Sequence, residues 1–141
     1  MISVIITSFK EPQVVGRAIE AAIKNKTKRK YEIIVAAPDE PTAQVIKKYV
    51  KKDKRVRYFR DKGRGKVGAL NELFAKVKSE ILILTDGDVW MSENAIENLV
   101  NALDDPKIGC VTGRPIAAND KNTMIGYWSH LLVDAGAHKI R

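Results

Sequence analysis

Two aspartates separated by one glycine, Asp86 and Asp88, are the clearest candidates for chemistry in this sequence. They follow a run of four apolar residues, 81–84, that is typical of a buried strand in a parallel sheet. Hard divalent cations prefer oxygen ligands, and in nucleotide sites one or two carboxylates hold the metal together with substrate phosphates. Asp86 and Asp88 are therefore predicted to ligate Mg²⁺ or Mn²⁺, and Gly87 is expected to let a ligand approach closely. A polar turn leading into a helix is the alternative.

A glycine-rich basic segment, residues 63–71, is the second candidate. Arg64 and Lys66 stand among glycines just before a predicted helix, so backbone N–H groups and cations would meet there, as a phosphate requires. The segment lacks the spacing and the Lys-Ser/Thr ending of a Walker loop, and it fails the context of the dinucleotide fingerprint. Taken alone, it could equally be a basic turn without a ligand.

Two smaller polar clusters follow the first two predicted strands. Thr7, Phe9 and Glu11 belong to the first, and Asp39 belongs to the second. Their hydroxyl, aromatic face and carboxylates could hold a base and a ribose. Either cluster could also be an ordinary loop.

Apolar runs of strand length alternate with segments of helical periodicity along the chain. Strands are predicted at 3–8, 31–37, 56–59, 80–85 and 108–112, and helices at 15–23, 41–50, 67–77, 92–103 and 123–138. Ser92 is the expected N-cap of the fourth helix. This alternation predicts an α/β fold with a mostly parallel sheet between helix layers, because each parallel crossover needs a helix. Ligands of such sheets bind beyond the carboxyl ends of the strands, where all four clusters fall.

Length, composition and charge indicate the number of domains and suggest a second possible function. A chain of 141 residues with 45% hydrophobic and 30% charged residues is predicted to form a single domain. Its net charge of +8 is concentrated in residues 47–66, which hold 11 basic and two acidic residues. Such a block is typical of a solvated helix face, but it also suits an anion. A module that binds nucleic acid or an acidic membrane through 47–66 is therefore the alternative function.

Three further features of the sequence bear on the cellular compartment of the protein. Cys110 is the single cysteine, so no internal disulfide is possible, and its apolar surroundings predict a small buried thiol in a reducing compartment. We find no signal peptide and no window near the roughly 18 apolar residues that span a bilayer. A cytoplasmic location is expected, and a place at the cytoplasmic face of a membrane is left open.

Taken together and in order, these clusters resemble the family 2 glycosyltransferases of the GT-A fold, a group that includes polysaccharide synthases and glycolipid-forming enzymes. Residues 3–11 are similar to the family's opening strand and first nucleotide loop. Residues 66–71 resemble its Lys-x-Gly-Ala-Leu-Asn segment, residues 86–88 its Asp-x-Asp metal motif, and residues 104–115 the segment that follows. The similarity covers nearly all of the chain.

The resemblance implies a three-layer, Rossmann-like α/β/α fold and a metal-dependent, inverting transfer from a UDP- or GDP-sugar to an acceptor hydroxyl or phosphate. It implies no nucleic-acid partner. It also implies that Asp88 ligates Mg²⁺ or Mn²⁺ and that Asp86 reaches the ribose or a metal-bound water. The other residues that it assigns to the nucleotide sugar are Thr7, Phe9, Glu11, Asp39, Arg64, Lys66 and Asn71.

The sequence departs from the family pattern in two places. Residues 36–38 stand where the family commonly has paired aspartates, so the contact of Asp39 with the base is displaced. In the family the acceptor half follows the region where this chain ends, so the single domain 1–141 is expected to lack it and to be inactive alone. No catalytic base is identified, since Asp120 and Asp134 are candidates only as carboxylates. The acceptor and the oligomeric state are not predicted.

Overall fold

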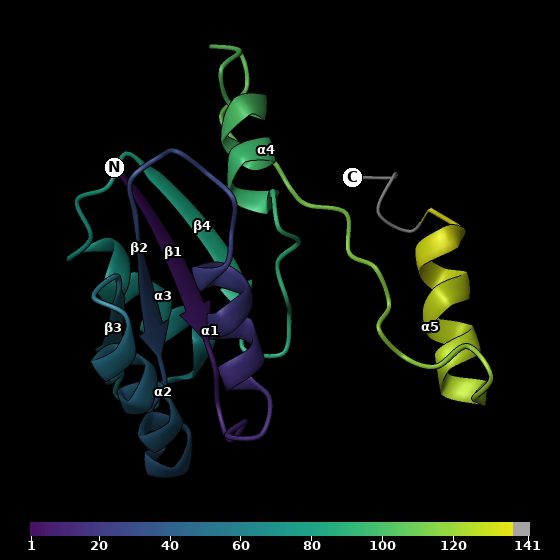
Figure 1. Cartoon of the computed structure of the whole chain (residues 1–141), viewed down its shortest axis with the longest axis horizontal. Helices are drawn as coiled ribbons and strands as arrows, with labels where there is room; N and C mark the ends of the chain where they lie inside the picture. Colours follow the sequence, from purple (N-terminus) through teal and green to yellow (C-terminus); the bar gives the residue numbers. More distant parts are fainter. Residues whose placement is uncertain (137–141) are drawn as a thin grey trace.

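The computed structural model of the chain describes residues 1–136 and confirms an α/β architecture on a parallel sheet (Figure 1). The sheet consists of β1 (Ile2–Thr7), β2 (Tyr31–Ala36), β3 (Val56–Phe59) and β4 (Ile81–Asp86) in the order β3-β2-β1-β4. Thr7 pairs with Ala36 on one side and with Asp86 on the other. The three strands β2, β1 and β4 therefore end level, and the loops that follow them meet at one edge.

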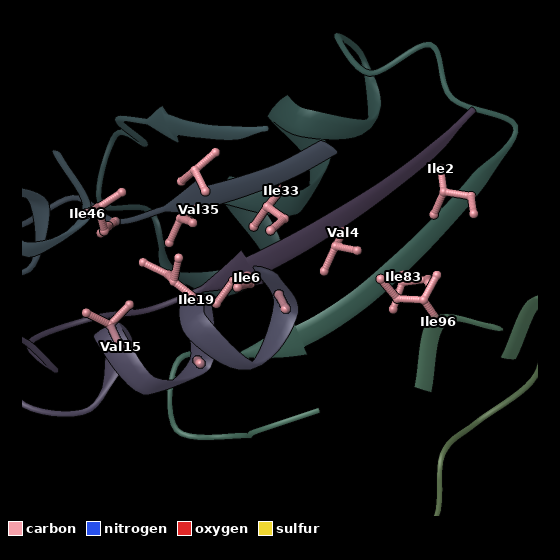
Figure 2. Packing of buried hydrophobic residues seen from close by; sticks show 14 of the residues in the cluster. Ile2, Val4, Ile6, Val15, Ile19, Ile33, Val35, Ile46, Ile83 and Ile96 are labelled. Carbon is pink, nitrogen blue, oxygen red and sulfur yellow. The ribbon is translucent and has the colours of Figure 1, made fainter. Parts of the chain in front are cut away.

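Helices cover both faces of the sheet. The covering helices are α1 (Val15–Ile23), α2 (Glu40–Lys52), α3 (Gly65–Phe74) and α4 (Ala95–Ala102), and a further helix, α5 (Met124–Asp134), follows them in the chain. Side chains alternate between the faces of a strand, so Val4 and Ile6 join the core with α1, α2 and α4, whereas Ile5 packs with Leu73 of α3. Figure 2 shows the larger cluster, in which Ile6 lies beside Ile19 and Ile83 lies beside Ile96. This arrangement makes three layers.

The start of α2 follows from local sequence. Asp39 precedes the helix, and its side chain accepts a hydrogen bond from the backbone N–H of Thr42. Pro41 stands in the first turn, where its missing N–H costs nothing. Lys51 and Lys52 lie in the last turn, where cations stabilise the helix dipole.

The predicted strand at 108–112 is wrong. Within residues 1–136, the segment between α4 and α5 contains no strand. Ile108 is 40% exposed and Cys110 is exposed, so the expectation of a buried thiol is also wrong. An apolar run becomes a strand only when a neighbouring strand takes its N–H and C=O groups, and nothing in the described chain pairs with β4 on its outer side.

The third and fourth helices start differently from the predictions. Ser92 is not the N-cap of α4, since the helix begins at Ala95 and the carbonyl of Ser92 accepts bonds from Ala95 and Asn25. α3 begins at Gly65 rather than Val67, and Val67 is 72% exposed although it belongs to the apolar periodicity that predicted the helix.

α5 stands apart from the sheet (Figure 1). Thr123 caps it by accepting a bond from Gly126, and the apolar residues that gave the segment its helical periodicity are exposed, with Ile125 at 70% and Trp128 at 56%. The helix ends at Asp134, with Ala135 as its C-cap, so the prediction that it continues through residues 135 and 136 is wrong; the last two predicted residues, 137 and 138, lie outside the described residues. Among residues 1–136, no helix combines the length and apolar character needed to cross a membrane.

Candidate functional site

A cavity of about 530 Å³ lies at the carboxyl edge of the sheet, where the strand-end loops meet. Six of the nine residues predicted for the nucleotide sugar and the metal lie in its wall. The residues that line the cavity are Thr7, Ser8, Phe9, Glu11, Ala36, Pro38, Asp61, Gly63, Gly65, Lys66, Ala69, Asp86 and Asp88.

Asp86 is held by two neighbours. One oxygen, Oδ1, accepts a hydrogen bond of 3.0 Å from the hydroxyl of Thr7, its partner in the β1–β4 register. The same oxygen lies 2.5 Å from Nζ of Lys66, which stands in the first turn of α3. The structure thus brings the basic loop and the first aspartate together, although β3 and β4 are opposite edge strands.

Asp88 differs from Asp86 in being exposed. Its carboxylate makes no hydrogen bond or ion pair with any other residue in the range 1–136. It lines the cavity all the same. Both oxygens of Asp88 are therefore available to an incoming cation, whereas Asp86 has its Oδ1 engaged by Thr7 and Lys66.

Gly87 has a different role from the predicted one. It is buried, and its N–H donates to the carbonyl of Thr7 at 2.8 Å. A Cβ atom at this position would contact the hydroxyl of Ser8 and would lie 2.8 Å from Oε2 of Glu11. Glycine is therefore needed so that the loop after β1 can close against the loop after β4, rather than to admit a ligand.

Glu11 lies in the cavity wall as part of a hydrogen-bonded chain. Its Oε2 accepts a bond of 2.8 Å from Ser8, and its backbone N–H donates to the buried hydroxyl of Thr42 at 3.1 Å. Ser8 was not among the predicted site residues, although it stands in the segment that the strand-end rule indicates after β1. Ser8 and Glu11 fix the loop that carries Phe9, whose ring is 59% exposed beside the cavity.

Asp39 is occupied as a helix cap and does not line the cavity. One oxygen accepts from the backbone N–H of Lys10 at 2.9 Å, and the other accepts from the N–H and hydroxyl of Thr42. Burial alone would raise the pKa of Asp39, but these hydrogen bonds outweigh it and hold the pKa below its usual value. Asp39 therefore links the loop after β2, in which it lies, to the loop after β1, which contains Lys10.

This link leads to a prediction on stability. Asp39→Ala should lower the free energy of unfolding by about 1 kcal/mol, the usual contribution of an N-cap. A carboxyl with a lowered native pKa stabilises the fold above its unfolded pKa, so the wild-type advantage should shrink as the pH falls from about 5 to about 3. Urea unfolding at several pH values measures both effects. Asp39→Asn keeps a capping oxygen and should lose the pH dependence while keeping most of the stability; a pH-independent wild-type advantage would contradict this account.

Arg64 and Asn71 are both exposed and lie outside the cavity wall. Arg64 is the residue before α3, and Lys62 in the same loop pairs with Glu72 at 3.5 Å. The wall instead contains Asp61, which accepts a hydrogen bond of 2.7 Å from the N–H of Gly63. Asp61 was not among the predicted site residues, although it lies in the loop that follows the carboxyl end of β3.

Trp90 holds the segment after Asp88 against α1. The guanidinium of Arg17 in α1 lies 3.6 Å from the centre of the Trp90 ring, a close cation–π contact. Trp90 therefore packs against α1 through Arg17. The loop carrying the two aspartates is thus tied to β1 at Gly87 and to α1 at Trp90.

Asp120, Asp134 and His130 all lie outside the cavity wall. Asp120 accepts bonds from Asn122, Asp134 lies 4.0 Å from Arg114, and neither lines the cavity. His130 contacts the backbone oxygen of Asn119. Among residues 1–136, no three His, Cys, Asp or Glu side chains form a group that could hold a metal by itself.

The charge of the cavity wall bears on what it could bind. Four carboxylates line it against one lysine, so the wall has a formal charge of −3. A free phosphate group would be repelled by this balance, whereas a divalent cation would be attracted. Mg²⁺ and Mn²⁺ commonly take one or two protein carboxylates and complete their shell with phosphates and water, and Asp88 with Asp86 fits that requirement.

Comparison with solved structures shows a shared fold. The mannosyltransferase PcManGT from Pyrobaculum calidifontis, in complex with GDP-Man and Mn²⁺, matches with a TM-score of 0.71 and 23% identity over 80% of this chain and 36% of its own. Staphylococcus aureus TarS 1–349, in complex with UDP-GlcNAc, matches with a TM-score of 0.60 and 16% identity over 84% of this chain and 38% of its own. This chain therefore spans little more than a third of their length.

Sequence comparison gives the family. A search of curated proteins finds no match. The family model described as Glycosyl transferase family 2 matches residues 3–134, which is nearly the whole chain. Together with the parallel sheet of the GT-A fold, this match shows that the chain belongs to glycosyl transferase family 2.

Proposed function

We propose that this chain is the donor-binding part of a metal-dependent, inverting glycosyltransferase that uses a UDP- or GDP-sugar and passes the sugar to an acceptor hydroxyl or phosphate. The observation that carries the proposal is the meeting of Lys66, Asp86 and Asp88 in one cavity. Family membership supports glycosyl transfer in general. The bound GDP-Man and UDP-GlcNAc of the similar structures support a nucleoside-diphosphate sugar as donor.

The cavity wall explains why a metal is proposed. Its carboxylates would repel the two negative charges of a diphosphate unless a cation stood between them. Asp88 would hold Mg²⁺ or Mn²⁺ through its free carboxylate, with Asp86 as a second ligand or a ligand through water. A bound divalent cation neutralises charge that the departing diphosphate gains in the transition state.

The chain's own residues would perform the remaining tasks. Lys66, now paired with Asp86, can turn its ammonium group to the diphosphate, because its side chain is exposed and flexible. The exposed ring of Phe9 offers an apolar face to the base. Thr7 would hold Asp86 in place through its hydroxyl rather than contact the nucleoside directly. The base that deprotonates the acceptor is left unassigned.

Titration calorimetry with UDP and GDP, in the presence and absence of Mn²⁺, tests the proposal. We expect saturable binding of at least one diphosphate that depends on the metal. Lys66→Met should weaken that binding at least tenfold, because a hydrogen bond to a charged group contributes about 1.5–3 kcal/mol. Lys62→Met is the matched control, since Lys62 lies in the same loop outside the cavity wall, and it should change the affinity less than twofold. Failure of every common nucleoside diphosphate to bind with metal would refute the proposal.

A further inference from the structure

The amino edge of the sheet, opposite the cavity, gathers two basic segments. Residues 24–30 enter β2, and residues 51–55 end α2 and enter β3. The guanidinium of Arg55 donates to the carbonyl of Ile23 at 3.1 Å and to the hydroxyl of Tyr31, so the two segments touch. In Figure 1 the loop that enters β2 lies at the same end of the sheet as the amino terminus. We call residues 24–30 and 51–55 the basic edge.

The basic edge carries the whole net charge of the protein. Its 12 residues hold nine basic side chains and one acidic one, a net charge of +8. The other 129 residues hold 16 basic and 16 acidic residues and are neutral overall. The block at 47–66 that stands out in the sequence is therefore divided in space, because its second half, from Arg60, belongs to the loop at the cavity.

Neighbouring carboxylates already engage four of the nine cations. Arg55 pairs with Asp53 at 2.7 Å, and Arg29 pairs with Glu97 at 3.5 Å. Lys24 pairs with Glu20, and Lys26 pairs with Glu93. The lysines of the basic edge that are exposed and make no ion pair within residues 1–136 are Lys28, Lys30, Lys51, Lys52 and Lys54.

We propose that the basic edge is a docking surface for an anionic lipid bilayer. The five unpaired cations are all lysines, which attract phosphate and carboxylate headgroups as point charges, whereas both arginines, the better groups for geometric readout, are used within the protein. Met1, 64% exposed, and Val50, 38% exposed, adjoin these lysines and supply apolar contact of the kind that interfacial binding uses.

The same surface is poorly suited to nucleic acid. The basic edge itself contains no aromatic residue, and the two tyrosines beside it already have cations over their rings, Arg55 over Tyr31 and Lys52 over Tyr49. The edge consists of loops and one helix end, and the helix that contacts it, α4, has no basic residue and directs Glu97 toward Arg29, so it offers no basic face to a groove. Because the cavity lies at the other edge, a docked protein would keep the cavity open to solution. This proposal does not depend on the chemistry of the cavity.

Vesicle sedimentation of the 141-residue chain tests the proposal. Vesicles of phosphatidylcholine with about 30% phosphatidylserine are compared with pure phosphatidylcholine at about 0.05 and 0.5 M NaCl, which changes the screening length severalfold. The edge variant replaces Lys28, Lys30, Lys51, Lys52 and Lys54 with Gln. The matched control replaces Lys47, Lys48, Lys62, Lys107 and Lys121 with Gln, which removes the same charge from outside the basic edge. Thermal melting checks that both variants fold.

We expect the wild-type chain to bind the anionic vesicles at low salt and to be released at high salt. The edge variant should lose at least tenfold in partition coefficient, while the control should stay within threefold of the wild type. Equal losses in the two variants would mean that total charge matters rather than the basic edge, and would overturn the proposal. Absence of vesicle binding, equal binding to neutral vesicles, or a higher affinity for a 20-base-pair DNA duplex than for anionic vesicles would overturn it as well.

Discussion

Asp88→Asn is expected to abolish the rise in melting temperature that the proposed function predicts for the wild-type chain with Mn²⁺ and UDP or GDP. Asp88 is exposed in the cavity and has no protein partner within residues 1–136, so the substitution removes a metal ligand without leaving a buried group unpaired. An amide is a far weaker ligand for a hard cation than a carboxylate. The melting temperature without ligand should change by less than about 2 °C, since exposed positions seldom matter to stability.

Asp105→Asn provides the matched control for this measurement. Asp105 is an exposed carboxylate that lies outside the cavity wall, so its substitution changes the net charge equally. The control should keep the full metal-dependent shift. If Asp88→Asn kept the shift as well, Asp88 would not be the metal ligand, and Glu11 and Asp61 would be the next carboxylates to test.

Gly87→Ala is expected to destabilise the protein by about 2 kcal/mol and to weaken nucleotide binding at the same time, because overpacking of a close contact costs about 1–3 kcal/mol. A methyl group here would lie 2.7 Å from Cβ of Ser8 and 2.8 Å from Oε2 of Glu11, closer than carbon atoms or a carboxylate oxygen can approach it. Because Gly87 stands between Asp86 and Asp88, the strain would also displace both carboxylates. Urea unfolding and calorimetry measure the two effects.

Two further variants separate this contact from a general effect of alanine. Gly109→Ala should be nearly neutral, because no atom lies within 4 Å of the position that a Cβ atom would take on that glycine. Ser8→Gly combined with Gly87→Ala removes the nearest obstructing side chain and should recover part of the lost stability. If the double variant were as unstable as the sum of the single ones, the contact between Ser8 and Gly87 would not be the cause.

The fold could be predicted where local pattern and packing agree. Val4 and Ile6 alternate with Ile5 in a strand that is buried on both faces, so an almost continuous apolar run identified β1. The run at 108–112 has similar composition, yet it is largely exposed and unpaired within the described chain, because strand formation depends on a neighbour that local sequence cannot supply. The exposed apolar residues of α5 illustrate the same limit, since periodicity predicts a face and not what covers it.

The candidate site was predictable in its main parts for one physical reason. Parallel strands end at a common edge, so Thr7, Lys66, Asp86 and Asp88 could be expected to meet without knowledge of the strand order. Asp39 shows what the sequence left open, because a carboxylate before a helix suits both a base contact and a cap, and only the bonds from Lys10 and Thr42 identify it as a cap.

By itself, the sequence determined the parallel α/β class, the order of the strand-end clusters and the total charge, because periodicity and composition are properties of the chain. Tertiary structure alone decided that Gly87 lies under Ser8 and Glu11, that Thr7 and Lys66 engage Oδ1 of Asp86 while Asp88 keeps both oxygens free within the described chain, and that the excess charge collects at the basic edge. These facts depend on contacts between residues far apart in the sequence, such as Thr7 with Asp86. Such contacts exist only after the sheet has assembled.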